Sequence, residues 1–407
     1  MRVEDPNGAW KPYGPDPRLL VAREPDEDGA GPYYRLLAEG TIRNYDGVLI
    51  PSAPERAGID PNRQFPYKWE RKVAGPWNAG DYPGSEPEVG ALLRAITDRP
   101  NICTYLAYHT FSGVHIRAYS DQNDEQLAAD DLWTYEFLGD LATELTGYPS
   151  ISGYHDFRYH PKSVIRGVGT DWAFDHLGVY AWTTEFWNAL RAAGLDDAHP
   201  LDWWRIHPLD EELQLLAWVD ENVPEGYVDW YPFHHPELGE VELGGWHAAL
   251  VFRNPPPHLL EAEVAPHSDL AIFQALCSPL LRLRDTIVEP SGDGTWRVRV
   301  VVENSGWLPT NISEKAVEQQ AVRSTVARLT LRDGAELVTG TERVDLGQLT
   351  GRALKHHAVR QFGNSDDTTD RAVAEWVVRA PAGTTLEVDV RHDRAGVVQT
   401  TVELGAS

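Results

Sequence analysis

Hydrophobic and polar residues follow two different patterns along the chain, and the change falls near residue 283. Before it, short apolar runs typical of strands buried on both faces of a parallel sheet occur at 101–108 and 178–186. Helical patterns precede, separate or follow these runs, at 85–97, 122–147, 187–193 and 258–281. This alternation predicts an α/β domain whose parallel strands are joined by crossover helices.

After residue 283, polar and apolar residues alternate with a period of two in short stretches that are separated by Gly, Asn and Asp turns. These stretches lie at 296–302, 325–331, 371–378, 386–390 and 397–404. The pattern predicts an antiparallel β-sandwich. A chain of 407 residues also favours more than one domain, so we expect an α/β domain at 1–282 and an all-β sandwich domain at 283–407. The second domain shows no catalytic pattern, and we expect it to support the first or to bind a partner.

Composition narrows the possible partners. The chain has 62 acidic and 36 basic residues, a formal charge of −26, which argues against nucleic acid or an anionic membrane as a partner. The two cysteines, Cys103 and Cys277, argue against structural disulfides and cysteine-based zinc sites. No apolar run is long enough to span a membrane, and the start of the sequence has no signal-peptide core, so we expect a cytoplasmic protein for the chain as written.

Two ionisable side chains end the two apolar runs. Glu185 closes the second run among Trp182, Phe186 and Trp187, and His109 closes the first. A carboxylate in apolar surroundings is costly to ionise without a partner, and the carboxyl ends of parallel strands are where open α/β sheets bind ligands. Each residue alone has an ordinary interpretation, a surface glutamate or a structural histidine. Together they predict a site for a metal or a general base.

Further motifs occur along the chain together with this pair, and the order in which they follow one another is recognisable. The chain carries Gly58-Ile-Asp-Pro-Asn-Arg-Gln-Phe-Pro66, then Ser85-Glu-Pro-Glu88, His109-Thr-Phe-Ser-Gly113, Asp171-Trp172 and Thr184-Glu185. Over roughly residues 1–280 it thereby resembles the zinc metallocarboxypeptidases of the carboxypeptidase A type. The resemblance implies hydrolysis of C-terminal amide bonds by a zinc-bound water, with a peptide or amide that has a free carboxyl terminus as substrate.

The resemblance also implies a role for each matching residue. His109 corresponds to a zinc ligand, Glu185 to the general base and acid, and Asn62 and Arg63 to the pair that binds the terminal carboxylate. The arginine that polarises the scissile carbonyl corresponds best to Arg43, although Arg35 and Arg56 compete for this role. The tyrosine that covers the substrate is expected at Ser163 by spacing, and Tyr159 can serve if the loop is longer here.

The chain departs from the family at its beginning. The family's first zinc-ligand segment, a His-x-x-Glu pair, should precede the turn at Asp5-Pro-Asn-Gly8, so two of the three expected zinc ligands have no counterpart. The implied fold is therefore an incomplete doubly wound mixed sheet, with impaired activity. We expect a truncated sequence, whose missing segment could also hold a signal peptide; the rival explanation is a true loss of the metal site.

His234 and Glu237 form another His-x-x-Glu pair. However, Pro236 favours a turn, and the pattern at 228–247 predicts a loop that leads into a strand or hairpin.

Two other functions remain open. A non-catalytic peptide-binding pseudoenzyme would use the Trp- and Tyr-rich pocket and Arg63 to hold peptide tails without cleavage. A glycosidase would pair two carboxylates, such as Asp171 and Glu185. Because Asp171 precedes the 178–186 strand and Glu185 ends it, we expect these two to lie at opposite ends, which ranks the glycosidase last.

Overall fold

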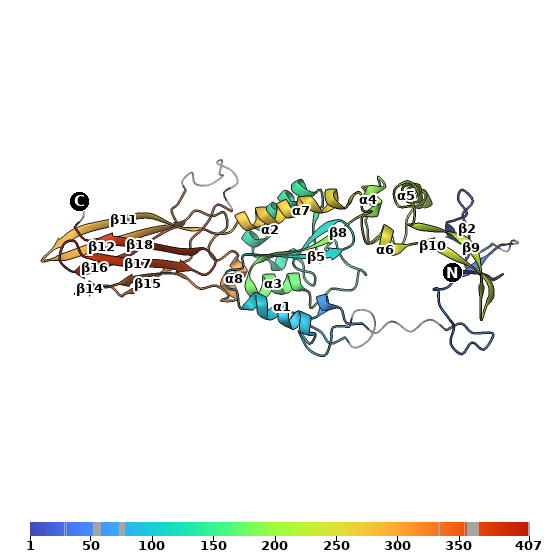
Figure 1. Ribbon diagram of the computed structural model, residues 1–407, viewed down its shortest axis with the longest axis horizontal. Coiled ribbons are helices and arrows are strands. Elements are labelled where there is room, and N and C mark those ends of the chain that lie inside the picture. Colours follow the sequence, from blue (N-terminus) through green and yellow to red (C-terminus); the bar gives the residue numbers. More distant parts are fainter. Residues whose placement is uncertain are drawn as a thin grey trace. The chain divides into compact units, whose positions relative to one another are not determined.

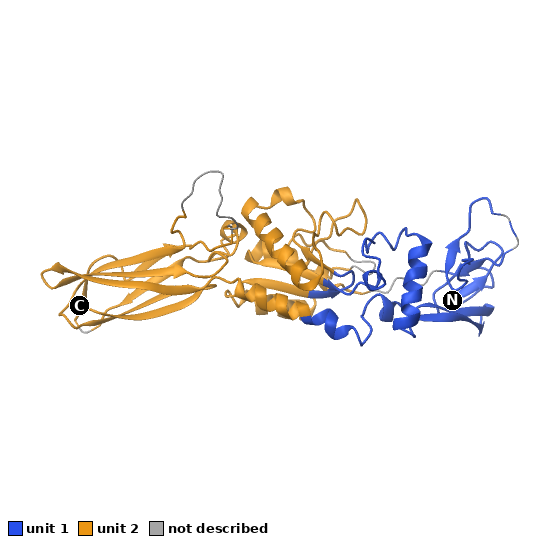
Figure 2. Ribbon diagram, turned by 90° about the horizontal axis from the view of Figure 1, so that it is seen from above, with its two compact units in different colours: residues 1–57, 108–113, 185–265 blue, residues 58–107, 114–184, 266–407 orange. Residues whose placement is uncertain are grey.

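The chain divides into two compact units (Figure 2). A computed structural model describes residues 1–407 except 28, 30, 52–57, 73–77, 333, 354, 356–365 and 406–407. Unit 1 comprises 1–57, 108–113 and 185–265, and unit 2 comprises 58–107, 114–184 and 266–407. The domain boundary expected between residues 282 and 283 lies inside unit 2. Each unit has a hydrophobic core of its own.

A four-stranded sheet forms the centre of the α/β part, in the order β5-β8-β6-β7. The strands are β5 (Thr104–Thr110), β6 (Val114–Arg117), β7 (Ser150–Ser152) and β8 (Tyr180–Phe186), and β6 and β7 run parallel. Every residue of β8 up to Glu185 is buried, as the continuous apolar run predicts. The last residues of β5 and β8 belong to unit 1.

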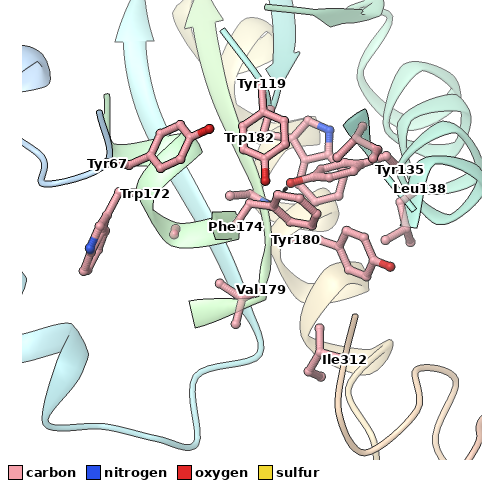
Figure 3. Packing of buried hydrophobic residues seen from close by; sticks show 14 of the residues in the cluster. Tyr67, Tyr119, Tyr135, Leu138, Trp172, Phe174, Val179, Tyr180, Trp182 and Ile312 are labelled. Carbon is pink, nitrogen blue, oxygen red and sulfur yellow. Dashed lines mark hydrogen bonds between the residues drawn. The ribbon is translucent and has the colours of Figure 1, made fainter. Parts of the chain in front are cut away.

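Helices cover both faces of this sheet, with α2 and α7 on one side and α1 and α3 on the other (Figure 1). They are α1 (Pro87–Thr97), α2 (Ala129–Thr146), α3 (Gly169–Leu177) and α7 (Leu260–Leu276), with 3₁₀ turns η1 (Pro61–Arg63) and η2 (Asp124–Gln126). The core between α2, α3 and β8 is aromatic (Figure 3). Around Tyr135 lie the rings of Phe174, Tyr180 and Trp182, with centroids at 4.9–5.1 Å. The Tyr135 hydroxyl also accepts the Ala181 N–H, which fixes β8 against α2.

The C-terminal part of unit 2 is an antiparallel β domain of two four-stranded sheets, β11-β12-β16-β14 and β15-β13-β17-β18. Its strands are β11 (Leu281–Gly292), β12 (Thr295–Asn304), β13 (Thr325–Thr330), β14 (Glu336–Thr339), β15 (Arg343–Gly347), β16 (Arg371–Arg379), β17 (Thr385–His392) and β18 (Gly396–Glu403). Buried residues of both sheets form one cluster, because every second residue points inward. The expected fold class, mixed α/β followed by antiparallel β, is confirmed.

A buried carboxylate joins the β domain to α2 within unit 2. The two Asp131 oxygens accept the N–H groups of Glu314 and Lys315 at 2.9 and 3.0 Å, and Tyr180 donates its hydroxyl at 3.1 Å. These N–H groups begin the short helix α8 (Glu314–Glu318), so Asp131 stabilises the helix start from another part of the chain. Arg394 adds bonds to the carbonyls of Asn311 and Leu177.

Unit 1 is built on a six-stranded antiparallel sheet in the order β3-β2-β4-β1-β10-β9. The strands are β1 (Arg2–Glu4), β2 (Trp10–Pro12), β3 (Leu20–Ala22), β4 (Tyr34–Leu36), β9 (Tyr227–His235) and β10 (Gly239–Trp246). Three helices, α4 (Ala189–Ala192), α5 (Leu209–Asn222) and α6 (Ala248–Val251), contribute to its core. Among the described residues, none of the helices combines the length and apolar character that a membrane crossing needs.

Candidate functional site

His109 and Glu185 lie next to each other at the ends of β5 and β8, both in unit 1. The His109 Nδ1 atom is 3.9 Å from Glu185 Oε1. The His109 side chain is 30% exposed and that of Glu185 only 10%, so the pair opens to solvent on the imidazole side. The loop after β5 is held against β8 because Gly113 N–H donates to the Glu185 carbonyl at 2.8 Å and Ser112 N–H to that of Trp187 at 3.0 Å.

The residue before Glu185 is anchored in unit 2. Thr184 Oγ1 lies 2.9 Å from Nδ1 of His115, a completely buried residue of β6. His115 Nε2 lies 2.9 Å from Thr146 Oγ1 at the end of α2. His115 of β6 thus links β8, just before the candidate catalytic carboxylate, to the end of α2.

A pocket of about 370 Å³ opens beside His109 within unit 1. Its walls include Tyr108 and Phe186, whose rings pack edge to face with centroids 5.1 Å apart. Arg253, Leu260 and Glu263 line it further along. The segment that carries Arg253 is tied to β5, because Thr110 Oγ1 donates to the Arg253 carbonyl at 2.8 Å. Sequence reasoning missed Arg253 and Glu263, since no local motif marks residues so distant from His109 along the chain.

Asn62 and Arg63 lie in the 3₁₀ turn η1 of unit 2, where both already have partners. Asn62 Oδ1 accepts the Gly169 N–H at 2.9 Å, so this side chain stabilises the first turn of α3. Arg63 donates to the Asn62 carbonyl at 2.8 Å, and its Nη1 lies 3.6 Å from Asp60 Oδ2. The Arg63 side chain is 11% exposed. Its guanidinium is thus held in place by the turn from which it projects.

The remaining candidates lie on surfaces and loops. Arg43 is exposed in a loop of unit 1, whereas its competitor Arg35 pairs with Asp5 at 3.0 Å. Arg56, the third candidate for that role, lies outside the described residues. Tyr159 is 42% exposed in unit 2, with its ring packed against Phe157.

The second His-x-x-Glu sequence lies in a hairpin, as the proline indicates. β9 and β10 form this hairpin, in which His234 bonds to Glu240 at 2.6 Å on the surface. Glu237 lies beside His235 instead, at 3.1 Å. His234 and Glu237 therefore have different partners and do not act as a ligand pair.

A catalytic zinc site needs more protein ligands than the described residues bring together. A catalytic zinc takes three protein ligands and keeps a fourth position for water. In the described part of the chain, no cluster of three or more His, Cys, Asp or Glu side chains is arranged to hold a metal. One imidazole and one carboxylate, His109 and Glu185, do not make a complete zinc site. The residues present therefore fit only a part of the site that the family resemblance implies.

Asp171, the second carboxylate of the glycosidase hypothesis, is completely buried in α3. It accepts the Ser120 N–H at 2.9 Å and the Ser120 hydroxyl at 3.2 Å. Burial raises the pKa of this carboxyl to about 7. A group enclosed in this way is a structural acceptor, which counts against a role with a sugar substrate.

A comparison with known protein families finds the same family that the sequence motifs indicate. Residues 41–196 match the family described as zinc carboxypeptidase, and residues 280–403 match a domain of unknown function (DUF8731). No curated protein matches the chain. This match confirms, for residues 41–196, the resemblance noted from the motifs.

Three solved structures are similar to part of this chain. Thrombin-activatable fibrinolysis inhibitor is 24% identical over 41% of this chain and 42% of its own, with a TM-score of 0.27. Carboxypeptidase A from Helicoverpa armigera is 17% identical over 44% and 43%, with a TM-score of 0.27. Bovine thrombin-activatable fibrinolysis inhibitor, solved in complex with tick carboxypeptidase inhibitor, is 21% identical over 49% of this chain and 64% of its own, with a TM-score of 0.26. This chain spans less than two thirds of each.

Proposed function

We propose that this protein is a carboxypeptidase-type hydrolase that cleaves amide bonds next to a free carboxyl terminus, with turnover impaired by an incomplete metal site. The observation that carries the proposal is the approach of His109 to Glu185 at 3.9 Å, at the ends of two neighbouring strands of a zinc carboxypeptidase segment. Zinc is the metal that the family implies, and His109 is its proposed ligand in this chain.

Glu185 is the proposed general base and acid. Its side chain is mostly buried and lies next to His109, and a carboxylate held in place can accept and donate a proton at the reacting group. It takes a proton from the attacking water and passes that proton to the nitrogen of the leaving amine. When bound, zinc would activate the water and polarise the carbonyl.

Arg63, Asn62, Arg43 and Tyr159 complete the proposal as substrate-binding groups. A guanidinium matches the planar geometry of a carboxylate, and the turn at Asp60 holds the Arg63 side chain in a fixed orientation. Arg63 and Asn62 are the proposed partners of the terminal carboxylate, Arg43 that of the scissile carbonyl, and Tyr159 covers the substrate. The β domain is proposed to support the α/β part of unit 2, to which Asp131 ties it.

The test is hydrolysis of an amino-blocked dipeptide with a free carboxyl terminus, with the carboxyl-amidated dipeptide as the substrate control. With zinc added, we expect slow hydrolysis of the free acid only, which a chelator stops. Because general acid–base catalysis contributes about 10²–10⁴-fold, Glu185→Gln should lower the rate by at least about 100-fold. Glu240→Gln, on the exposed hairpin, is the matched control and should leave the rate unchanged.

Three outcomes would count against the proposal. Rapid, chelator-sensitive turnover at one zinc per chain would contradict the impairment. Turnover that survives Glu185→Gln would remove Glu185 from the mechanism. Peptide binding that Arg63→Gln weakens, without turnover at any zinc concentration, would favour the non-catalytic peptide-binding protein instead.

A further inference from the structure

The pocket beside His109 contains a cationic group whose charge is not balanced. Arg253 lies on its wall, and no Asp or Glu among the described residues forms an ion pair with its guanidinium. The guanidinium lies over the Phe111 ring, 5.1 Å from the ring centroid. Packing against an aromatic face orients the arginine and leaves N–H groups for a ligand.

The other walls are mostly apolar. Tyr108 and Phe186 form the aromatic side, and Leu260 and Val264 from the first turns of α7 form the aliphatic side. Of the described residues that line the pocket, Glu263 is the one with a carboxylate, and it lies 3.5 Å from Arg191. Arg191 therefore balances the negative charge of Glu263. Among the described residues, no carboxylate balances the positive charge of Arg253 in the same way.

We propose that this pocket binds a ligand in which a carboxylate is joined to an apolar or aromatic group. The guanidinium of Arg253 would bind the carboxylate, and the aromatic and aliphatic walls would enclose the apolar part. The volume, about 370 Å³, lies within the range of small-ligand pockets. A chain of charge −26 repels anions at long range, so selection of an anionic group here depends on this local cation.

In a peptide substrate, the matching group is an acidic side chain close to the amide bond beside His109, with its methylene groups against the apolar walls. This assignment to the substrate rests on the proposed function, whereas binding to the pocket does not. Arg253 is accordingly a specificity-determining residue for a second carboxylate, distinct from the terminal carboxylate assigned to Arg63.

Calorimetric titration of the full chain with 3-phenylpropionate and with its neutral isostere, 3-phenylpropionamide, tests the proposal. We expect the acid to bind at least ten-fold more tightly than the amide. Arg253→Gln should bring the two affinities together by weakening only the acid. Arg205→Gln, an exposed arginine of unit 1 outside the pocket, should retain the preference.

A second pair of variants tests the apolar walls. Val264 is partly exposed, so Val264→Trp can fill the pocket without disturbing a core, and it should weaken both probes. Ile272→Trp adds the same bulk at an exposed position of the same helix and should change neither affinity. Equal binding of acid and amide by the wild-type chain, or a preference that survives Arg253→Gln, would overturn the proposal.

The Arg63→Gln variant, compared with Arg253→Gln, distinguishes a failure of the pocket proposal from a failure of the proposed function. If it removes the preference for the acid while Arg253→Gln does not, the carboxylate binds at Arg63, and only the pocket proposal fails. If Arg253→Gln removes the preference but the chain hydrolyses no peptide, the pocket stands and the proposed function fails.

Discussion

Both ring nitrogens of His115 are engaged by threonine hydroxyls in the interior of unit 2. Thr146 Oγ1 donates its own hydrogen to the Ala142 carbonyl at 2.7 Å, so it must accept the hydrogen on His115 Nε2. In the neutral ring, Nδ1 carries no hydrogen and accepts the Thr184 hydroxyl. Burial, helped by the neighbouring His267, lowers the pKa of His115 to about 3.

This arrangement predicts a loss of stability in acid. The pKa of His115 is lower in the folded than in the unfolded chain, where it is about 6.5, so its contribution is complete above pH 6.5 and is lost progressively towards pH 3. Urea unfolding between pH 7 and pH 4 should show this slope. His115→Gln, which cannot bind a proton, should be less stable at pH 7 by about 1–3 kcal/mol and have a shallower slope. His258→Gln, at an exposed position, should keep the wild-type slope.

The sequence indicated which residues could lie close together only where a motif marks them, and their roles stay predictions. His109 and Glu185 each end an apolar run, and the structure brings them to 3.9 Å. The partners of Asn62 could not be foreseen, because its bond to Gly169 joins residues 107 positions apart. Arg253 has no motif around it, and only the fold brings it to the wall of the pocket that includes His109.

At the scale of elements, long or fully buried segments were predicted well. β8 and α2 were expected from their apolar patterns and are present, with α2 beginning at Ala129 after the separate 3₁₀ turn η2. β1 to β4 were not expected, because strands of three residues have too few positions to show alternation. β11 was missed because most of its residues are exposed and charged residues interrupt its alternation.

The attachment of α8 to α2 gives a prediction at this scale. Burial raises the pKa of Asp131, against the opposing effect of its bonds to the α8 backbone. Asp131→Ala removes the acceptor of two backbone N–H groups and of the Tyr180 hydroxyl, and should cost at least about 2 kcal/mol of unfolding free energy. Chemical unfolding followed by tryptophan fluorescence measures this.

Neighbouring substitutions serve as controls for that prediction. Asp131→Asn retains one carbonyl oxygen and should cost less than Asp131→Ala. Asp130→Ala changes an exposed carboxylate in the same helical turn and should cost well under half as much. Equal losses for Asp130→Ala and Asp131→Ala would mean that the bonds to α8 add nothing to stability.

At the scale of the whole molecule, charge dominates the expected solution behaviour. The formal charge of −26 implies mutual repulsion among surface carboxylates, which salt screens. Raising the salt concentration at pH 7.5 from 10 mM to 300 mM should stabilise the protein by about 1 kcal/mol, or about 1–2 °C in the unfolding midpoint of a chain of this size. Near the isoelectric point, about pH 4.9, the same addition should have almost no effect. A rise of equal size at both pH values would assign the effect to something other than net charge.

The change of pattern near residue 283 correctly predicted an α/β part followed by an antiparallel β part. The assembly of unit 1 from three separate segments could not be predicted, because its sheet depends on pairings between distant residues. Local periodicity shows which residues prefer a strand, but it carries no information about a partner some 240 positions away.

That long-range pairing has a consequence for biosynthesis. β1 pairs with β10 at Arg2 and Glu242, and an ion pair of 2.8 Å joins the same two side chains. During synthesis β1 therefore waits until about residue 246 has emerged from the ribosome before its sheet can close. At about 5–20 residues per second, this delay lasts roughly 12–50 s. During that time β1 carries an unpaired backbone edge, and chaperones that bind extended chains have a period in which to act.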